Sequence, residues 1–187
     1  MSTTTVILIV LLVVAVAIAA WAIIERRRAL RIRRKFGPEY DRLATELGPH
    51  SAASTLEERE KRVSRFPIRS LQTDERARLA AEWRIIQERF VDDPRGAVAD
   101  ADELIQQALK TRGYPISEFE QRTADLSVEF PHVVENYRTA HRIAMEAERG
   151  AASTEQLRQA MRHYRVLFED VLESKVSKAE PMEVHRG

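Results

Sequence analysis

The strongest helical signal in this sequence lies in residues 153–176, STEQLRQAMRHYRVLFEDVLESKV. Ser153 and Gln156 stand at the spacing of a capping box, in which two side chains satisfy free amide groups at a helix start. Apolar residues then recur every three or four positions, as one face of an α-helix requires: Leu157, Met161, Tyr164, Leu167, Phe168 and Val171. We therefore expect an amphipathic helix from about residue 154 to 176 with its apolar face in a core.

Residues 73–113 predict two further helices joined by a short turn. Thr73 or Asp74 caps the first helix, which carries an apolar face made of Leu79, Trp83, Ile86 and Phe90. The second helix begins at Asp93, whose carboxylate can accept from the free amides, followed by Pro94 at the first helical position. Gly113 ends it.

Residues 117–150 predict a short helix and a longer one. Ser117 with Glu120 forms a second capping box, Pro131 begins the longer helix, and Gly150 ends it. No stretch of the chain alternates apolar and polar residues as a strand would. The predicted fold class is therefore all-α, with a compact bundle of about four main helices plus short ones over residues 73–176. Residues 177–187 contain few apolar residues and are expected to be a disordered tail.

Residues 25–72 predict a basic and charged helical stalk ahead of the bundle. The helix breakers Gly37-Pro38 and Gly48-Pro49 interrupt it twice, and the charged helix that follows stops before Pro67. Thr55 and Glu58 stand at capping-box spacing, which places the start of this charged helix near residue 55. Its apolar content is low, so we expect the stalk to be built mainly from charged helix faces.

Ahead of the stalk, after a five-residue N-terminal tail, residues 6–24 read VILIVLLVVAVAIAAWAII without one charged side chain. A helix of this length reaches roughly 28 Å, about the thickness of one hydrocarbon core. The sequence thus predicts a transmembrane helix. A cleaved signal peptide is the alternative, because the segment is rich in alanine near its end, but residues 1–5 lack the basic side chains of such a peptide.

A cluster of cations, which we name the basic collar, directly follows the apolar run: Arg26, Arg27, Arg28, Arg31, Arg33, Arg34 and Lys35. Such a cluster stays on the cytoplasmic side of a membrane, which predicts a single-pass protein of the inner (plasma) membrane with its N-terminus outside. We expect the collar, with Trp21 at the interface, to contact the membrane surface, with anionic lipids as candidate partners. A stop-transfer signal without lipid specificity is the alternative, and the Ala15 and Ala19 spacing keeps a homodimer open.

The composition excludes several classes of function. The 187 residues contain no cysteine, and the six glycines are too dispersed for a phosphate-binding loop. From residue 36 onward 23 basic and 28 acidic residues give a net charge of −5, which argues against nucleic acid as a partner. Glu129 and His132 match an ExxH spacing, but Pro131 between them marks a helix start, so we predict no metal, no cofactor and no catalytic residues. Tyr137 and His141, at the border of an apolar stripe, are candidates for contact with a partner.

Five short stretches together resemble an uncharacterised bacterial family whose members are called hypothetical or secreted proteins. They are Phe36–Arg42 (FGPEYDR), Phe90–Pro94 (FVDDP), Arg112–Pro115 (RGYP), Phe119–Ser127 (FEQRTADLS) and Tyr137–His141 (YRTAH). The resemblance implies a single membrane helix followed by a helical domain, and it implies no activity. The basic collar argues against secretion.

The function expected from the sequence is that of a membrane-tethered cytoplasmic interaction module, an adaptor or scaffold with an unknown protein partner, rather than an enzyme. Two alternatives stay open at this point. One is a ligand-binding or enzymatic helical bundle with a site near Tyr137 and His141. The other is an exported helical domain released by signal-peptide cleavage.

Overall fold

The computed structural model describes the backbone of residues 3–174 and the side chains of residues 11–174. Over these residues the chain forms eight α-helices and no strand, so the predicted all-α fold class is confirmed. The helices are α1 (Thr3–Phe36), α2 (Pro38–Leu47), α3 (Pro49–Val63), α4 (Thr73–Arg89), α5 (Pro94–Arg112), α6 (Phe119–Glu129), α7 (Val134–Glu148) and α8 (Thr154–Glu173). The tail predicted at residues 177–187 lies outside the described residues. Of the N-terminal tail predicted at residues 1–5, residues 3–5 belong to α1.

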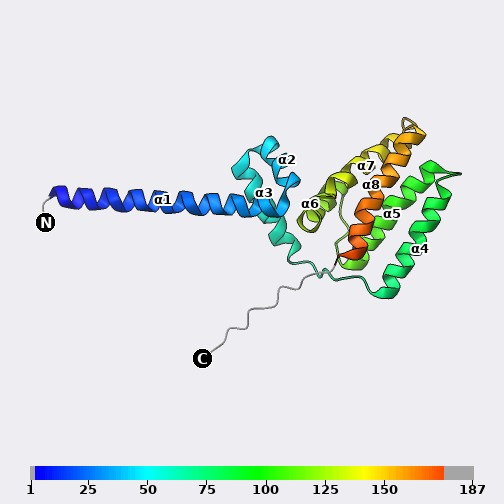
Figure 1. The fold of residues 1–187 in the computed structure, drawn as a ribbon, viewed down its shortest axis with the longest axis horizontal. Helices are drawn as coiled ribbons and strands as arrows, with labels where there is room; N and C mark the ends of the chain where they lie inside the picture. Colours follow the sequence, from blue (N-terminus) through cyan, green and yellow to red (C-terminus); the bar gives the residue numbers. More distant parts are fainter. Residues whose placement is uncertain (1–2, 175–187) are drawn as a thin grey trace, which may run out of the picture.

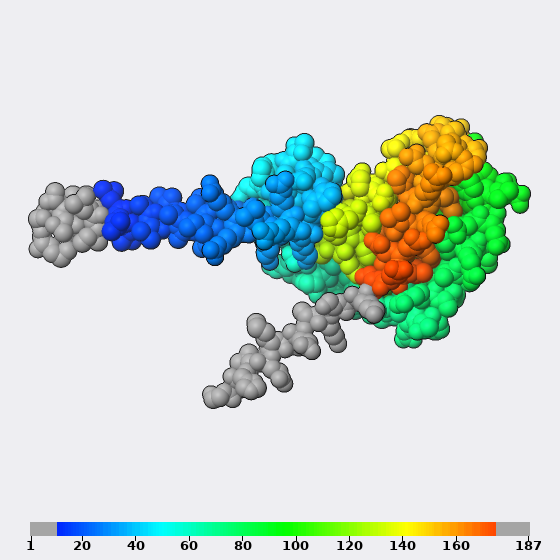
Figure 2. Space-filling view, viewed as in Figure 1, coloured from blue at the N-terminus to red at the C-terminus, as the bar shows by residue number. Residues whose placement is uncertain are grey.

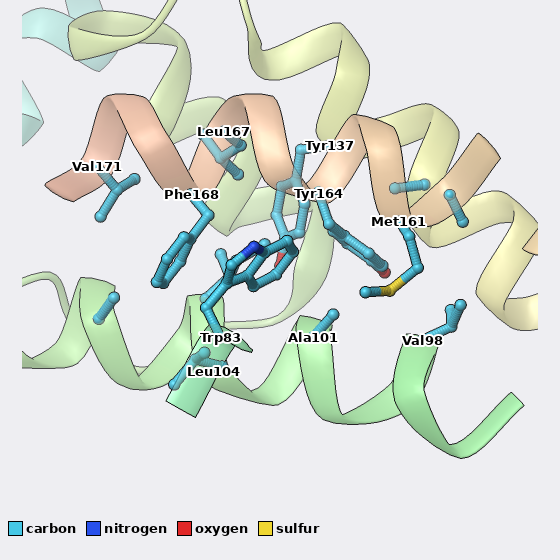
Figure 3. Packing of buried hydrophobic residues seen from close by; sticks show 14 of the residues in the cluster. Trp83, Val98, Ala101, Leu104, Tyr137, Met161, Tyr164, Leu167, Phe168 and Val171 are labelled. Carbon is cyan, nitrogen blue, oxygen red and sulfur yellow. The ribbon is translucent and has the colours of Figure 1, made fainter. Parts of the chain in front are cut away.

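Helices α4 to α8 form a bundle around one hydrophobic core (Figure 1). Helix α8 lies against both α7 and α5, and α4 packs on α5. The whole predicted stripe of α8 is buried, as are Leu79, Trp83 and Ile86 of α4, while Phe90 is partly buried. Figure 3 shows Trp83 lying against Phe168 of α8, with the two rings stacked at a centroid distance of 4.7 Å. The apolar faces predicted from the periodicity therefore meet in the core.

The stalk contains a second, smaller core that the sequence did not predict. Ile32 and Phe36 at the end of α1 pack against apolar side chains of α2 and α3: Tyr40, Leu43, Ala52, Ala53 and Leu56. Helix α1 is 34 residues long and passes without a break from its apolar part into this core. In Figure 2 the blue part of α1 projects away from the rest of the molecule.

The helix starts show which capping predictions hold. Asp93 accepts from the amide of Gly96 at 2.9 Å, and Ser153 with Gln156 forms the predicted capping box. The other two boxes are wrong. Thr55 lies inside α3, which already begins at Pro49 because the breaker pair ends one helix and starts the next. Ser117 lies ahead of α6, whose N-cap is Glu118, and α4 is capped by Gln72, one residue earlier than expected.

Gly113 ends α5 as predicted, in a position that only glycine can fill. Its φ is +99°, and a Cβ atom there would lie 2.4 Å from the carbonyl oxygen of Pro67. The segment between α3 and α4 passes close by, and the amide of Arg69 donates to the carbonyl oxygen of Arg112 at 2.8 Å. This connecting segment is thereby held against the end of α5.

Within the described part of the chain, no helix is both long enough and apolar enough to cross a membrane. The transmembrane helix expected at residues 6–24 is not supported by this finding and stays a prediction.

Candidate functional site

The basic collar lies on the second half of α1 and is partly neutralised by α3. Arg28 and Arg31 both pair with Glu57, and Lys35 pairs with Glu60 at 2.6 Å. Arg33 pairs with Asp41 of α2. Over residues 11–174, the collar members that make no ion pair are Arg26, Arg27 and Arg34. The collar thus has two roles, since four of its cations hold the stalk together and three are free to meet anions.

A groove runs between α1 and the start of α3, next to the collar. Trp21 and Arg26 of α1 line it together with Pro49 and His50 of α3. His50 Nδ1 lies 3.0 Å from Glu25 Oε1, which ties the start of α3 to α1. Trp21 itself is exposed. The first turn of α3 therefore lies beside the end of the apolar run of α1 and next to the unpaired Arg26.

A buried carboxylate, Glu39 of α2, joins the stalk to the bundle. The residue is 2% exposed and accepts from three arginines, Arg42 and Arg59 of the stalk and Arg138 of α7, at 2.7–3.2 Å. Burial raises the pKa of this carboxyl, but the hydrogen bonds and charges of the three arginines outweigh it and hold the pKa at about 2. Glu39 is therefore ionised and fully paired at neutral pH.

A second ion pair strengthens the same contact. Arg62 of α3 donates to both oxygens of the buried Asp125 of α6 at 2.6 and 2.7 Å. Arg59 also donates to Ser127 Oγ at 3.1 Å. Together with Glu39 these contacts fix α2 and α3 against α6 and α7.

Arg112, at the end of α5, is fully buried and ties three helices of the bundle together. It donates to the carbonyl oxygen of Val171 at 2.9 Å and pairs with Glu129 of α6, which also accepts from Tyr114 and Ser174. Glu129 is thus the last residue of α6 and part of an ion pair, whereas His132 is exposed and lies before α7. The two residues do not share a helix face. Over the described range, no group of three or more acidic or histidine side chains is arranged to hold a metal ion.

The two residues predicted to contact a partner lie in the bundle rather than on its surface. Tyr137 is fully buried, so its side chain is not accessible to a protein partner in this arrangement. His141 is half-buried and stacks on Phe119 of α6 at a centroid distance of 3.7 Å. Burial lowers the pKa of its imidazole below 6.5. The neutral imidazole therefore packs as an aromatic ring between α6 and α7.

A polar cluster that the sequence did not predict surrounds Asp102 of α5. The hydroxyls of Tyr137 and Tyr164 are buried beside the Asp102 carboxylate and hydrogen-bond to it, and Asp102 Oδ2 also accepts from Gln106 at 2.6 Å. Burial and the nearby Asp102 charge raise the pKa of both tyrosines. The Asp102 carboxylate thus has partners within the bundle, as buried polar groups normally do.

Comparison with known proteins gives no precedent for the features described above. No family model matches the chain, and no curated protein and no solved structure matches it either. The resemblance proposed from the five short stretches therefore stays a prediction, and the function has to be argued from the chain itself.

The neutral state of His141 predicts a pH dependence of stability. Because the folded chain disfavours the imidazolium, the unfolded chain binds more protons as the pH falls below 6.5. Stability contributed by His141 is therefore complete above this pH and is lost as the pH falls toward the lowered folded-state pKa. We expect chemical denaturation at pH 7.5 and 5.5 to show a smaller difference for His141→Gln than for the unchanged chain. The exposed His132→Gln is the control and should leave the difference unaltered; an unaltered difference in His141→Gln would contradict the prediction.

Proposed function

We propose that this chain is a membrane-tethered adaptor: α1 anchors it, and the helices from α2 to α8 form a rigid module that docks a protein partner at the inner face of the plasma membrane. The observation that carries the proposal is α1 itself. One unbroken helix is apolar and uncovered in its first part and embedded in a folded core at its other end.

The exposed side chains of α1 support the anchor. Large apolar residues from Leu11 to Ile24 are 49–65% exposed on all sides of the helix, and no described part of the chain covers them. A helix that is apolar all round is normally buried in a core or in a membrane. The apolar run begins at Val6 in the sequence, five residues ahead of the first described side chain, Leu11.

The charges next to the apolar run support the orientation. Arg26 lines a groove together with Trp21, and Arg27 and Arg34 further along α1 also keep free guanidinium groups that could meet anionic headgroups. Retention of these cations inside the cell places the five-residue N-terminus outside. We therefore propose an N-out, C-in topology, with the bilayer and its anionic lipids as one partner of the protein.

The rigid connection between α1 and the bundle supports an adaptor more than a freely moving enzyme. Ile32 and Phe36 are fully buried in the small core, and Glu39 and Asp125 lock this core to the bundle. The module therefore stands at a fixed orientation close to the membrane. Isolated apolar side chains on its surface, such as Ile85, Val91 and Ile116, are available to an unknown protein partner.

A ligand-binding bundle is the second candidate function, favoured by the hollow between α5 and α7, which Asp102 and His141 line. An exported domain after signal-peptide cleavage is disfavoured. The basic collar that follows the apolar run argues against export.

Topology can be tested cleanly because the chain contains no cysteine. Single variants Ser2→Cys and Val91→Cys would be exposed to a membrane-impermeant maleimide in intact spheroplasts and again after lysis. We expect Ser2→Cys to be labelled in intact cells, and Val91→Cys, at an exposed position, to be labelled only after lysis.

The unpaired arginines provide a sharper variant of this test. Replacing Arg26, Arg27 and Arg34 together by glutamate removes the charge bias without touching the ion pairs with α3, so part of the population should invert. The matched control replaces three exposed arginines far from α1, Arg84, Arg149 and Arg162, and should keep the orientation. Labelling of Val91→Cys in intact cells, or recovery of the chain in the soluble fraction, would refute the anchor and orientation.

A further inference from the structure

A hollow of about 200 Å³ lies on the surface of the bundle, between the end of α4 and the first half of α8. Its apolar lining comes from Phe90 of α4, which is partly buried, and from Met161 of α8, which is 8% exposed. Gln87 adds one neutral polar side chain on the α4 side. Aromatic and methionine side chains are enriched at protein interfaces, where they contact an apolar side chain of the partner.

Three arginines of α8, Arg158, Arg162 and Arg165, complete the lining, and we name this site the basic hollow. Among the described residues, no acidic side chain lines it. Arg162 is exposed and makes no ion pair or hydrogen bond with any residue of the described range. This positive charge is local, because the chain from residue 36 onward carries a net charge of −5.

The other two arginines are only weakly engaged. Arg158 pairs with Glu155, and Arg165 pairs with Glu169, in both cases within about one turn of α8. All four side chains are exposed, and exposed pairs of this kind contribute about 0–1 kcal/mol. Carboxylates of a partner can therefore replace Glu155 and Glu169 at little cost in free energy.

The position of the basic hollow favours a protein as its occupant. Figure 1 shows the end of α4 and the start of α8 on the side of the bundle opposite to the start of α1. If α1 is the anchor, the hollow therefore faces away from the lipid surface. A nucleic-acid backbone would match the arginines, but its phosphates offer nothing to the apolar lining of Phe90 and Met161.

We propose that the basic hollow docks an acidic amphipathic helix of the protein partner. One apolar side chain of that helix lies between Phe90 and Met161, and its carboxylates pair with the three arginines. The inference rests on the proposed function, because it locates the surface with which the adaptor meets its partner. An apolar anchor seated in a small pocket supplies affinity, whereas complementary charge at the rim speeds association and excludes basic partners.

The test uses the full chain, labelled with ¹⁵N and held in micelles of a non-ionic detergent, and four probes. The first is a short capped peptide in which leucines recur once per helical turn among glutamates and alanines. The second carries lysine in place of each glutamate, and the third carries serine in place of each leucine. The fourth is a thymidine oligonucleotide with the same net charge as the first peptide.

We expect the glutamate-leucine peptide to shift the amide signals of Gln87 and Met161 saturably. Its dissociation constant should be on the order of 0.1 mM, because a flexible peptide loses conformational entropy when it binds. The lysine peptide should cause no saturable shift. The serine peptide and the oligonucleotide should each bind about tenfold more weakly or worse, since neither offers an apolar anchor.

Replacing the three arginines together by glutamine should weaken binding of the glutamate-leucine peptide by about tenfold or more. Their side chains are exposed, so the fold should be kept. The matched control replaces Arg78, Arg95 and Arg142 by glutamine. These are also exposed, lie outside the hollow, and include two members of one-turn ion pairs, so binding should stay unchanged.

Three results would overturn the inference. They are the absence of saturable binding of the glutamate-leucine peptide, equally tight binding of the oligonucleotide, and equal effects of the two triple variants. None of them alters the result expected from the cysteine labelling described above. A failure of this docking surface is therefore distinguishable from a failure of the membrane anchor.

Discussion

Replacing Trp83 by alanine is expected to lower the free energy of unfolding by about 3–5 kcal/mol. Trp83 is 6% exposed and stacks on Phe168 with an interplanar angle of 18°, so truncation removes a large apolar side chain and leaves a cavity between α4 and α8. Chemical denaturation of the chain in detergent, followed by circular dichroism, measures the change.

Ile85→Ala is the matched control on the same helix. Ile85 is 64% exposed, so its truncation should change the free energy of unfolding by no more than about 0.5 kcal/mol. Equal effects of the two substitutions would mean that the stripe containing Trp83 is not the core-facing side of α4. In that case the bundle would have to pack differently from the arrangement in Figure 3.

Replacing Glu39 by glutamine is expected to cost about 3 kcal/mol. Removing one member of a buried ion pair typically costs about 3–5 kcal/mol, because the remaining charge stays buried without compensation. Arg42, Arg59 and Arg138 retain 32%, 17% and 19% side-chain exposure, which places the expected loss at the lower end of that range. The loss should also appear as faster proteolysis between the stalk and the bundle, because Glu39 connects the two.

Glu135→Gln is the control for this substitution. Glu135 pairs with the same Arg138 but is 65% exposed, so its contribution should be within about 0.5 kcal/mol. The pH dependence gives an independent check. Because the pKa of Glu39 falls from 4.5 to about 2 on folding, its contribution is complete above pH 4.5 and is lost as the pH falls through 2. If Glu39→Gln unfolds with the same acid dependence as the unchanged chain, Glu39 does not have this role.

Local signals in the sequence were sufficient for the apolar face of α8 and for the starts of α5 and α8. The stripe from Leu157 to Val171 and the caps at Asp93 and Ser153 depend on neighbours within one or two turns, so periodicity and capping chemistry identify them. Thr55 shows the limit of the same approach. A capping-box spacing also occurs inside a helix, and Pro49 six residues earlier provided the actual start of α3.

The ion pairs that position the stalk could not be read from the sequence, because their members are far apart along the chain. Glu39 and Arg138 are separated by 99 residues, and Arg62 and Asp125 by 63. Nothing local distinguishes these side chains from the many charged residues on exposed helix faces. Arg112 is different, since it continues the buried spacing of Ile105, Ala108 and Leu109 on α5 and could have been suspected of being buried.

The polar cluster at Asp102 depends both on local sequence patterns and on contacts between residues far apart in the chain. Tyr137 and Tyr164 were placed on apolar faces correctly, but their hydroxyls meet Asp102 only after α5, α7 and α8 assemble. The sequence pointed to His141 because it stands at a stripe border, and the structure places it against Phe119 and at the hollow between α5 and α7. His141 was thus a candidate from the sequence, whereas Asp102 was not.

The unbroken course of α1 has a mechanical consequence. Between its apolar part and the buried Ile32 and Phe36 there is no turn, glycine or proline that would act as a swivel. A membrane helix adapts to a thinner or thicker bilayer by changing its tilt. Helices α2 and α3 pack on the end of α1, and Glu39 joins them to α7 through ion pairs. A change in the tilt of α1 would therefore move the whole bundle with it. If α1 spans the bilayer as proposed, bilayer thickness would thereby change the distance between the bundle and the lipid surface.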